Sequence, residues 1–166
     1  MQNPFDKYLL WEWHRLLKKG TVDDEIDNIG KWKRYANQLS KTDLKLCEPH
    51  LVESNMFNLL ADWNESRKDI YAIADFHQKF EHIHPFQDGN GRIGRFIILR
   101  QCIENDVDLI AIDDEYNKEY RQTLYEAQTT GNIDSLVEVF KKCQVRLDEK
   151  LSDFTSIIKQ VSEETN

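Results

Sequence analysis

The sequence predicts an all-α protein, a compact bundle of several helices. Apolar residues recur at intervals of three and four along most of the 166 residues, which is the period of an amphipathic helix. The composition, 40% hydrophobic and 31% charged, is that of a globular domain. We expect a single domain over residues 1–150, with residues 151–166 forming a C-terminal helical extension or tail.

The first helix has clear start and stop signals. Asn3-Pro4 combines a capping residue with a proline suited to the first helical position. Lys18-Lys19-Gly20 provides a cationic last turn and a glycine stop. Residues 21–29 are acidic and aperiodic, and they predict a loop.

Residues 30–48 have no helical stripe, and they are the one stretch where we expect a short β-hairpin. Pro49 then opens a second long helix, with an apolar face that runs to Trp63. The next periodic segments predict helices over 68–81 and 90–105. A further helix is expected to be capped by Asp113 or Asp114 and to be broken at Thr130-Gly131-Asn132, and the last helix to start near Asp134.

Charge and cysteine usage narrow the class of protein. The formal net charge of −8 argues against binding to nucleic acid, because phosphate backbones require clustered cations. No apolar run approaches membrane-spanning length, and the N-terminus lacks the pattern of a signal peptide. The three cysteines are widely spaced and odd in number, so we expect free thiols and a cytoplasmic protein, or one delivered into a host cytosol.

The most informative stretch, His84–Arg95, reads His-Pro-Phe-Gln-Asp-Gly-Asn-Gly-Arg-Ile-Gly-Arg. An apolar helical pattern begins at Ile93, so the Gly-Asn-Gly turn is expected at a helix N-terminus, where unpaired N–H groups and the helix dipole favour an anion. Gly89 and Gly91 allow close approach of a ligand, and the amide of Asn90 can donate to a phosphoryl oxygen.

Charged side chains complete this pattern. Arg92 and Arg95 are three residues apart, so a helix presents both guanidinium groups on one side, where they suit successive phosphates. Asp88 would be repelled by phosphate unless a divalent cation lies between them, which makes it a candidate magnesium ligand. His84 titrates near neutral pH and can accept a proton from a hydroxyl that attacks phosphorus.

Each of these features alone has an ordinary structural explanation, and only their joint occurrence is specific. We expect the other histidines, His14, His50, His77 and His82, to be structural. A zinc site is disfavoured, because His77 and His82 are five residues apart on a helix and no further ligand completes a set.

His84–Arg95 resembles the signature of the Fic family, His-Pro-Phe-x-Asp/Glu-Gly-Asn-Gly-Arg-x-x-Arg, and matches it at every defined position. Residues 76–83 resemble the family's helix before the motif, residues 30–34 the opening of its hairpin flap, and residues 120–127 a later helix that borders the nucleotide. The resemblance covers about residues 3–140 and implies the all-α Fic fold with a short β-hairpin flap.

The resemblance implies a protein adenylyltransferase, which transfers AMP from Mg-ATP to a hydroxyl side chain of a target protein and releases pyrophosphate. It makes His84 the general base and Asp88 the ligand of the Mg²⁺ cofactor, with ATP as substrate. The residues that it places at the nucleotide are Gly89, Asn90 and Gly91 as anion hole, Arg92 and Arg95 at the distal phosphates, and Tyr116 and Tyr120 at the adenine. Aromatic residues at helical spacing are more often part of a core, so the two tyrosines have both interpretations.

The family flap, here about residues 30–48, is implied to dock the target protein by strand addition. Many relatives carry an inhibitory Ser/Thr-x-x-x-Glu-Gly/Asn motif, whose glutamate pairs with the second motif arginine. Thr21–Glu25 fits its first five positions, but Ile26 replaces the sixth residue. We therefore expect no intrinsic inhibitory motif, and either a constitutively competent protein or one restrained by a separate antitoxin-like protein.

Two other functions stay open. One is a nucleotide-binding regulatory module without turnover, although His84, Asp88 and both arginines are all present. The other is a Fic enzyme that transfers UMP, phosphocholine or a terminal phosphate. Gly91 disfavours phosphorylation, since the kinase-like members carry a lysine at that position.

Overall fold

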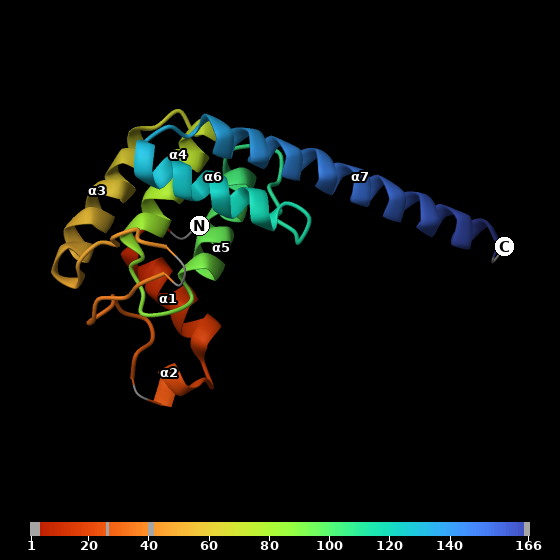
Figure 1. The fold of residues 1–166 in the computed structure, drawn as a ribbon. Coiled ribbons are helices and arrows are strands. Elements are labelled where there is room, and N and C mark those ends of the chain that lie inside the picture. Colours follow the sequence, from red (N-terminus) through yellow and green to blue (C-terminus); the bar gives the residue numbers. More distant parts are fainter. Residues whose placement is uncertain (1–3, 26, 40–41, 165–166) are drawn as a thin grey trace.

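The computed structural model describes residues 4–25, 27–39 and 42–164 (Figure 1). Its helices are α1 (Lys7–Lys18), α2 (Val22–Glu25), α3 (Val52–Glu65), α4 (Ile70–Ile83), α5 (Asn90–Glu104), α6 (Asn117–Thr130) and α7 (Asp134–Glu164). A 3-10 turn over Pro49–Leu51 leads directly into α3. The described residues contain helices and no strand, which confirms the all-α class.

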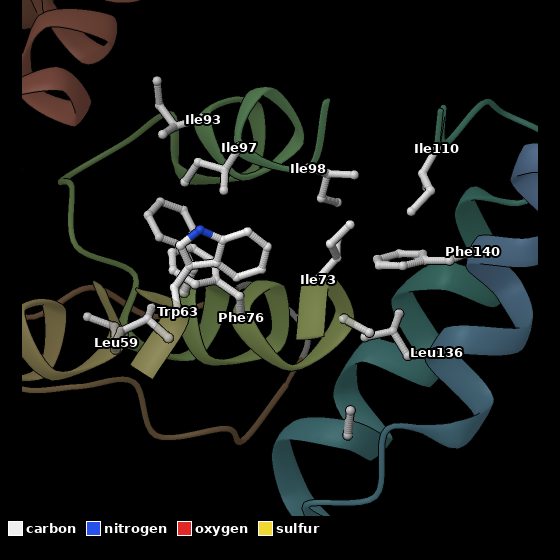
Figure 2. Packing of buried hydrophobic residues seen from close by; sticks show 14 of the residues in the cluster. Leu59, Trp63, Ile73, Phe76, Ile93, Ile97, Ile98, Ile110, Leu136 and Phe140 are labelled. Carbon is white, nitrogen blue, oxygen red and sulfur yellow. The ribbon is translucent and has the colours of Figure 1, made fainter. Parts of the chain in front are cut away.

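Helix α4 lies at the centre of the bundle, in contact with α3, α5, α6 and α7. Its apolar side chains Ile73, Phe76 and Phe80 are fully or almost fully buried, as the helical spacing predicts. In Figure 2 the isoleucines of α5 face Trp63 and Phe76 across this core, and α7 closes one end with two large side chains. The labelled residues of α5 and α7 are Ile93, Ile97, Ile98, Leu136 and Phe140.

Helix α7 packs against the body with its first half and then projects away from it (Figure 1). Residues 151–164 continue this helix, and the side chains of Leu151 and Phe154 are exposed. No helix in the described part of the chain is long and apolar enough to cross a membrane.

The helix boundaries depart from the sequence prediction at the N-terminus. Asp6 caps α1 by accepting a hydrogen bond of 3.0 Å from the N–H of Leu9, so the helix begins after Pro4 rather than at it. Asn3, the predicted cap, lies outside the described residues. The loop predicted over 21–29 is also wrong in part, because α2 forms one helical turn there.

The later boundaries lie closer to the prediction. Helix α4 begins two residues after the expected start, where Asp69 accepts a bond of 2.9 Å from the N–H of Ala72. Helix α6 begins at Asn117, because Asp113 caps the preceding turn rather than the helix itself. Gly131 ends α6 in the left-handed conformation (φ 78°), so the break predicted at this glycine is confirmed.

The hairpin predicted over 30–48 is not seen in residues 30–39 or 42–48, and residues 40–41 lie outside the described part. The described parts of this segment instead contact the loop between α4 and α5 and the last turn of α4. The N–H of Lys33 donates to the carbonyl of Pro85 at 2.8 Å, and the N–H of Cys47 donates to that of His82 at 3.3 Å. Two backbone N–H groups of the segment are thus used to hold it against the motif loop and the last turn of α4.

Candidate active site

The motif loop joins α4 to α5 and is held closed by the side chain of Asn90. The Oδ1 atom of Asn90 accepts from the N–H of Phe86 at 2.8 Å, and its Nδ2 donates to the carbonyl of Phe86, also at 2.8 Å. Both residues are buried, and Phe86 anchors the loop in the core. The amide of Asn90, predicted to meet a phosphate, is engaged inside the loop, which leaves that contact to the backbone N–H of this residue.

The start of α5 has the local geometry of an anion site. Gly89 precedes the helix in the left-handed conformation (φ 84°), which glycine adopts at little cost. The N–H groups of Arg92 and Ile93 both donate to the Gly89 carbonyl at 3.1 Å. The N–H groups of Asn90 and Gly91 come before the first helical bond, so they have no carbonyl of their own helix to meet. These groups and the helix dipole together favour an anion.

The two motif arginines extend this cradle along one side of α5. Both side chains are exposed, and Arg92 Nη2 lies 3.5 Å from Asp88 Oδ2. Among the described side chains, no carboxylate lies within ion-pair distance of Arg95, although its charge acts on the buried Glu81 from farther away. The structure therefore brings the predicted cationic groups to the same end of the helix.

Asp88 stands at the mouth of the cradle with 61% of its side chain exposed. Lys18, from the end of α1, donates to Asp88 Oδ2 and also lies 2.5 Å from Asp23 Oδ2. The bond from Lys18 lowers the pKa of the Asp88 carboxyl below its ordinary value, so the group is an anion at neutral pH. This lysine is nearly buried, and its contact joins residues that are 70 apart in sequence.

His14 is a second residue of the site that sequence reasoning left without a partner. Its Nδ1 accepts from the N–H of Gly30 at 3.0 Å, so its Nε2–H donates to the carbonyl of Asp88, also at 3.0 Å. Its ring stacks on Phe86 with 4.1 Å between centroids. Burial lowers the pKa of this histidine, which keeps the ring neutral and ties α1, the 30–48 segment and the motif loop together.

His84 ends α4 in the left-handed conformation (φ 50°), an uncommon backbone for a non-glycine residue, and 15% of its side chain is accessible. Its Nδ1 lies 3.2 Å from the carbonyl oxygen of Glu81. A carbonyl only accepts, so this bond places the proton on Nδ1 and leaves Nε2 free to take one. Burial is the main cause that lowers the pKa of His84 from 6.5 to about 4, so the ring is neutral at physiological pH.

Tyr120 lies in the core, which agrees with the second of its two interpretations. Only 5% of this residue is exposed, and its hydroxyl lies 2.7 Å from His77 Nε2 inside the bundle. A side chain engaged in the core is unavailable to line an open pocket. Tyr116 is partly buried and packs against the same core, and its role at the nucleotide stays a prediction.

The chain is similar to known proteins in sequence and in fold. A probable protein adenylyltransferase from Aquifex aeolicus is 34% identical over 83 residues, which are 48% of this chain and 25% of that protein. A Fic domain containing signaling protein from Bacteroides thetaiotaomicron has a TM-score of 0.73 at 19% identity, over 87% of this chain and 61% of that one.

The BepC protein of Bartonella tribocorum, solved with bound AMPPNP, has a TM-score of 0.69 at 17% identity, over 86% of this chain and 75% of that one. At these identities the solved structures show a shared fold. The chain spans only a quarter of the curated Aquifex relative and about 61% of the Bacteroides structure.

The sequence model of the Fic/DOC family matches residues 4–102, more than half of the chain. The matched region contains α1, which supplies Lys18 and His14, and the complete motif loop with the start of α5. The fold and the sequence lead to the same conclusion: the chain belongs to the Fic/DOC family.

Proposed function

We propose that this chain is a protein adenylyltransferase, which transfers AMP from ATP to a hydroxyl group of a target protein. The observation that carries the proposal is the pairing of a neutral imidazole with a free Nε2 on His84 and an anion cradle at the start of α5. The curated relative is named a probable protein adenylyltransferase, and the BepC structure holds an ATP analogue, which supports the same assignment.

In this reaction the hydroxyl oxygen of the target forms a bond to the α-phosphorus of ATP, and the bond from that phosphorus to the bridging oxygen of pyrophosphate breaks. His84 Nε2 takes the hydroxyl proton, and pyrophosphate leaves with the electron pair. The N–H groups of Asn90 and Gly91 stabilise charge on the transferred phosphoryl group, and Arg92 and Arg95 hold the departing phosphates. Positioning and charge stabilisation are thus the main contributions of the protein.

Asp88 is the residue that would hold Mg²⁺. Its ionised carboxylate is a hard oxygen ligand at the mouth of the cradle, and no cluster of three or more ligating side chains occurs in the described residues. Mg²⁺ commonly takes one or two carboxylates together with substrate phosphates, so a single carboxylate here fits that ion. When bound, the ion would neutralise phosphate charge.

The target protein and the control of the activity form a further part of the proposal. Lys33 and Asn37 bond to the motif loop at Pro85 and Phe86, so a target segment docked on this part of the predicted flap would be close to His84. Ile26 at the sixth position of the Thr21–Glu25 match supports the absence of the inhibitory motif in this segment. We infer that restraint, where it occurs, comes from a separate antitoxin-like protein.

The test is incubation of the chain with each labelled nucleoside triphosphate and with CDP-choline, in the presence of magnesium and a cell lysate, followed by mass spectrometry. An added AMP on a hydroxyl side chain is the expected product. Added UMP or phosphocholine would show that the donor is not ATP. Added phosphate would show that the transferred group is not AMP. Binding of ATP without any modified product would favour the regulatory module instead.

Arg95→Ala is expected to weaken ATP binding by about 1–3 kcal/mol, since one charge-assisted contact to the distal phosphates is lost. Isothermal titration with a non-hydrolysable ATP analogue measures this change. AMP, which lacks the distal phosphates, provides the control and should bind both forms equally. An unchanged affinity for the ATP analogue would remove Arg95 from the phosphate site.

A further inference from the structure

A buried carboxylate lies directly behind the proposed base. Glu81 is on α4, one turn before His84, and only 8% of its side chain is exposed. Acidic side chains are rarely buried without a partner, because removing the charge from water is costly. The position of this carboxylate therefore requires a physical explanation.

Glu81 contacts His84 with two different groups. Its backbone carbonyl lies 3.2 Å from His84 Nδ1, and its Oε2 lies 3.7 Å from the same nitrogen. The Nδ1–H of the imidazole thus points into a region that holds two acceptors from one residue. A carboxylate at this distance stabilises the imidazolium that forms when Nε2 takes a proton.

The other carboxylate oxygen of Glu81 has no hydrogen-bond partner within the described part of the chain. It is pressed against the backbone of α5 at Gly94, where an added Cβ would overlap it and come within 3.1 Å of His77 Cε1. A glycine at this position therefore makes room for the carboxylate. An unpaired buried oxygen costs stability, which is typical of a group kept for a functional reason.

We propose that Glu81 is the positioning residue for His84, holding its Nδ1–H and stabilising the charged imidazole during proton transfer. The inference rests on the proposed adenylyltransferase function. The carboxylate of Glu81 contacts the imidazole of His84, and the imidazole takes the proton of the target hydroxyl. Glu81 therefore acts on the hydroxyl only through His84.

The surroundings of Glu81 allow it to change charge near neutral pH. The groups that face it are His77 on α4, Arg95 on α5 and Tyr120 on α6, while Lys33 and Asp88 act on His84 from the neighbouring loops. Burial raises the pKa of Glu81 to about 7, and the charge of Arg95 opposes this rise. The carboxylate is thus ionised above about pH 7 and loses its charge as the pH falls.

Glu81→Gln tests the inference, because it keeps the size of the side chain and removes its charge. We expect kcat for AMP transfer to fall roughly tenfold to a hundredfold, and KM for ATP to change little. The fall is smaller than the loss of the base itself would cause, because His84 is still present. In the wild type the rate should decline as the pH falls below about 7, as Glu81 takes up a proton. This decline should be absent in the variant.

Gln101→Leu is the matched control, since Gln101 is another buried polar residue, on α5, whose side chain has no partner in the described residues. It should keep the wild-type kcat and pH profile. Urea denaturation of both variants checks that they are folded. A wild-type kcat in Glu81→Gln, or a persistent decline near pH 7, would overturn the inference.

A measurement without turnover separates this inference from the proposed function. Nitrogen NMR of the nucleotide-free protein should find the His84 proton on Nδ1, with an Nδ1 resonance that shifts as the nearby Glu81 carboxyl titrates near pH 7. In Glu81→Gln this shift should be absent, and a shift that persists there would contradict the positioning role even if AMP transfer is observed. Conversely, a shift lost in the variant without transfer of AMP by the wild type would keep the role of Glu81 and refute only the adenylyltransferase assignment.

Discussion

Replacement of His84 by alanine is expected to abolish AMP transfer while the affinity for ATP stays within several-fold of the wild type. A positioned general base contributes about 10²–10⁴ in rate, and the imidazole is the one group of the site with a free, neutral acceptor nitrogen. ATP is held by the start of α5 and the arginines, which the substitution leaves in place. Mass spectrometry of modified target and calorimetry of ATP binding measure the two effects separately.

His82→Ala provides the control for this experiment, because it removes the same type of side chain two residues earlier. The backbone carbonyl of His82 accepts a hydrogen bond from the N–H of Cys47. The substitution changes only the side chain, so this bond is kept. Transfer by this variant should be close to that of the wild type. If His84→Ala fails to unfold cooperatively, the histidine is structural, and if it still transfers AMP, another group is the base.

The pH profile separates the base from its neighbour. A base must be unprotonated, so the contribution of His84 is lost only as the pH falls through about 4. A solvent-exposed histidine would lose it near 6.5. A decline near 7 that disappears in Glu81→Gln would therefore belong to the carboxylate and leave the limb near 4 to the imidazole.

The sequence predicts the helices of this fold well because their signals are local. The apolar stripe of α4 and the glycine turn before α5 each lie within about fifteen residues, and both elements form as expected. The start of α1 is missed because Asp6 and Asn3-Pro4 offer competing caps. The hairpin is absent from residues 30–39 and 42–48 because Lys33 bonds to the motif loop and Cys47 to the last turn of α4, a choice set by contacts distant in sequence.

In the candidate site, too, local features could be predicted from the sequence and contacts between distant residues could not. Residues 84–95 are neighbours in sequence, so their chemistry and spacing can be recognised together. Lys18 and His14 reach Asp88 from α1, across 70 and 74 residues, and no local pattern indicates those contacts. The side chain of Asn90 is likewise drawn into the loop by the buried backbone of Phe86, because buried polar groups must be paired.

Gly94→Ala is expected to lower the free energy of unfolding by about 1–3 kcal/mol, although alanine in a helix normally stabilises by up to about 1 kcal/mol. The reason is that the new methyl group would overlap Glu81 Oε1 and crowd His77, and both side chains are buried between α4, α5 and α6. The carboxylate could move only by displacing packed neighbours. Urea denaturation measures the loss.

Gly91→Ala, three residues earlier in the same helix, is the matched control for stability. Its added methyl group would meet only Arg95 Nη1, at 3.7 Å, an ordinary contact, so its free energy of unfolding should be equal to or above that of the wild type. Equal stability of the two variants would show that the carboxylate has room to withdraw. In that case Gly94→Ala should still transfer AMP more slowly, because a carboxylate displaced from α5 no longer faces His84 Nδ1. Wild-type stability together with wild-type turnover would leave neither the packing nor the positioning role of Glu81 standing.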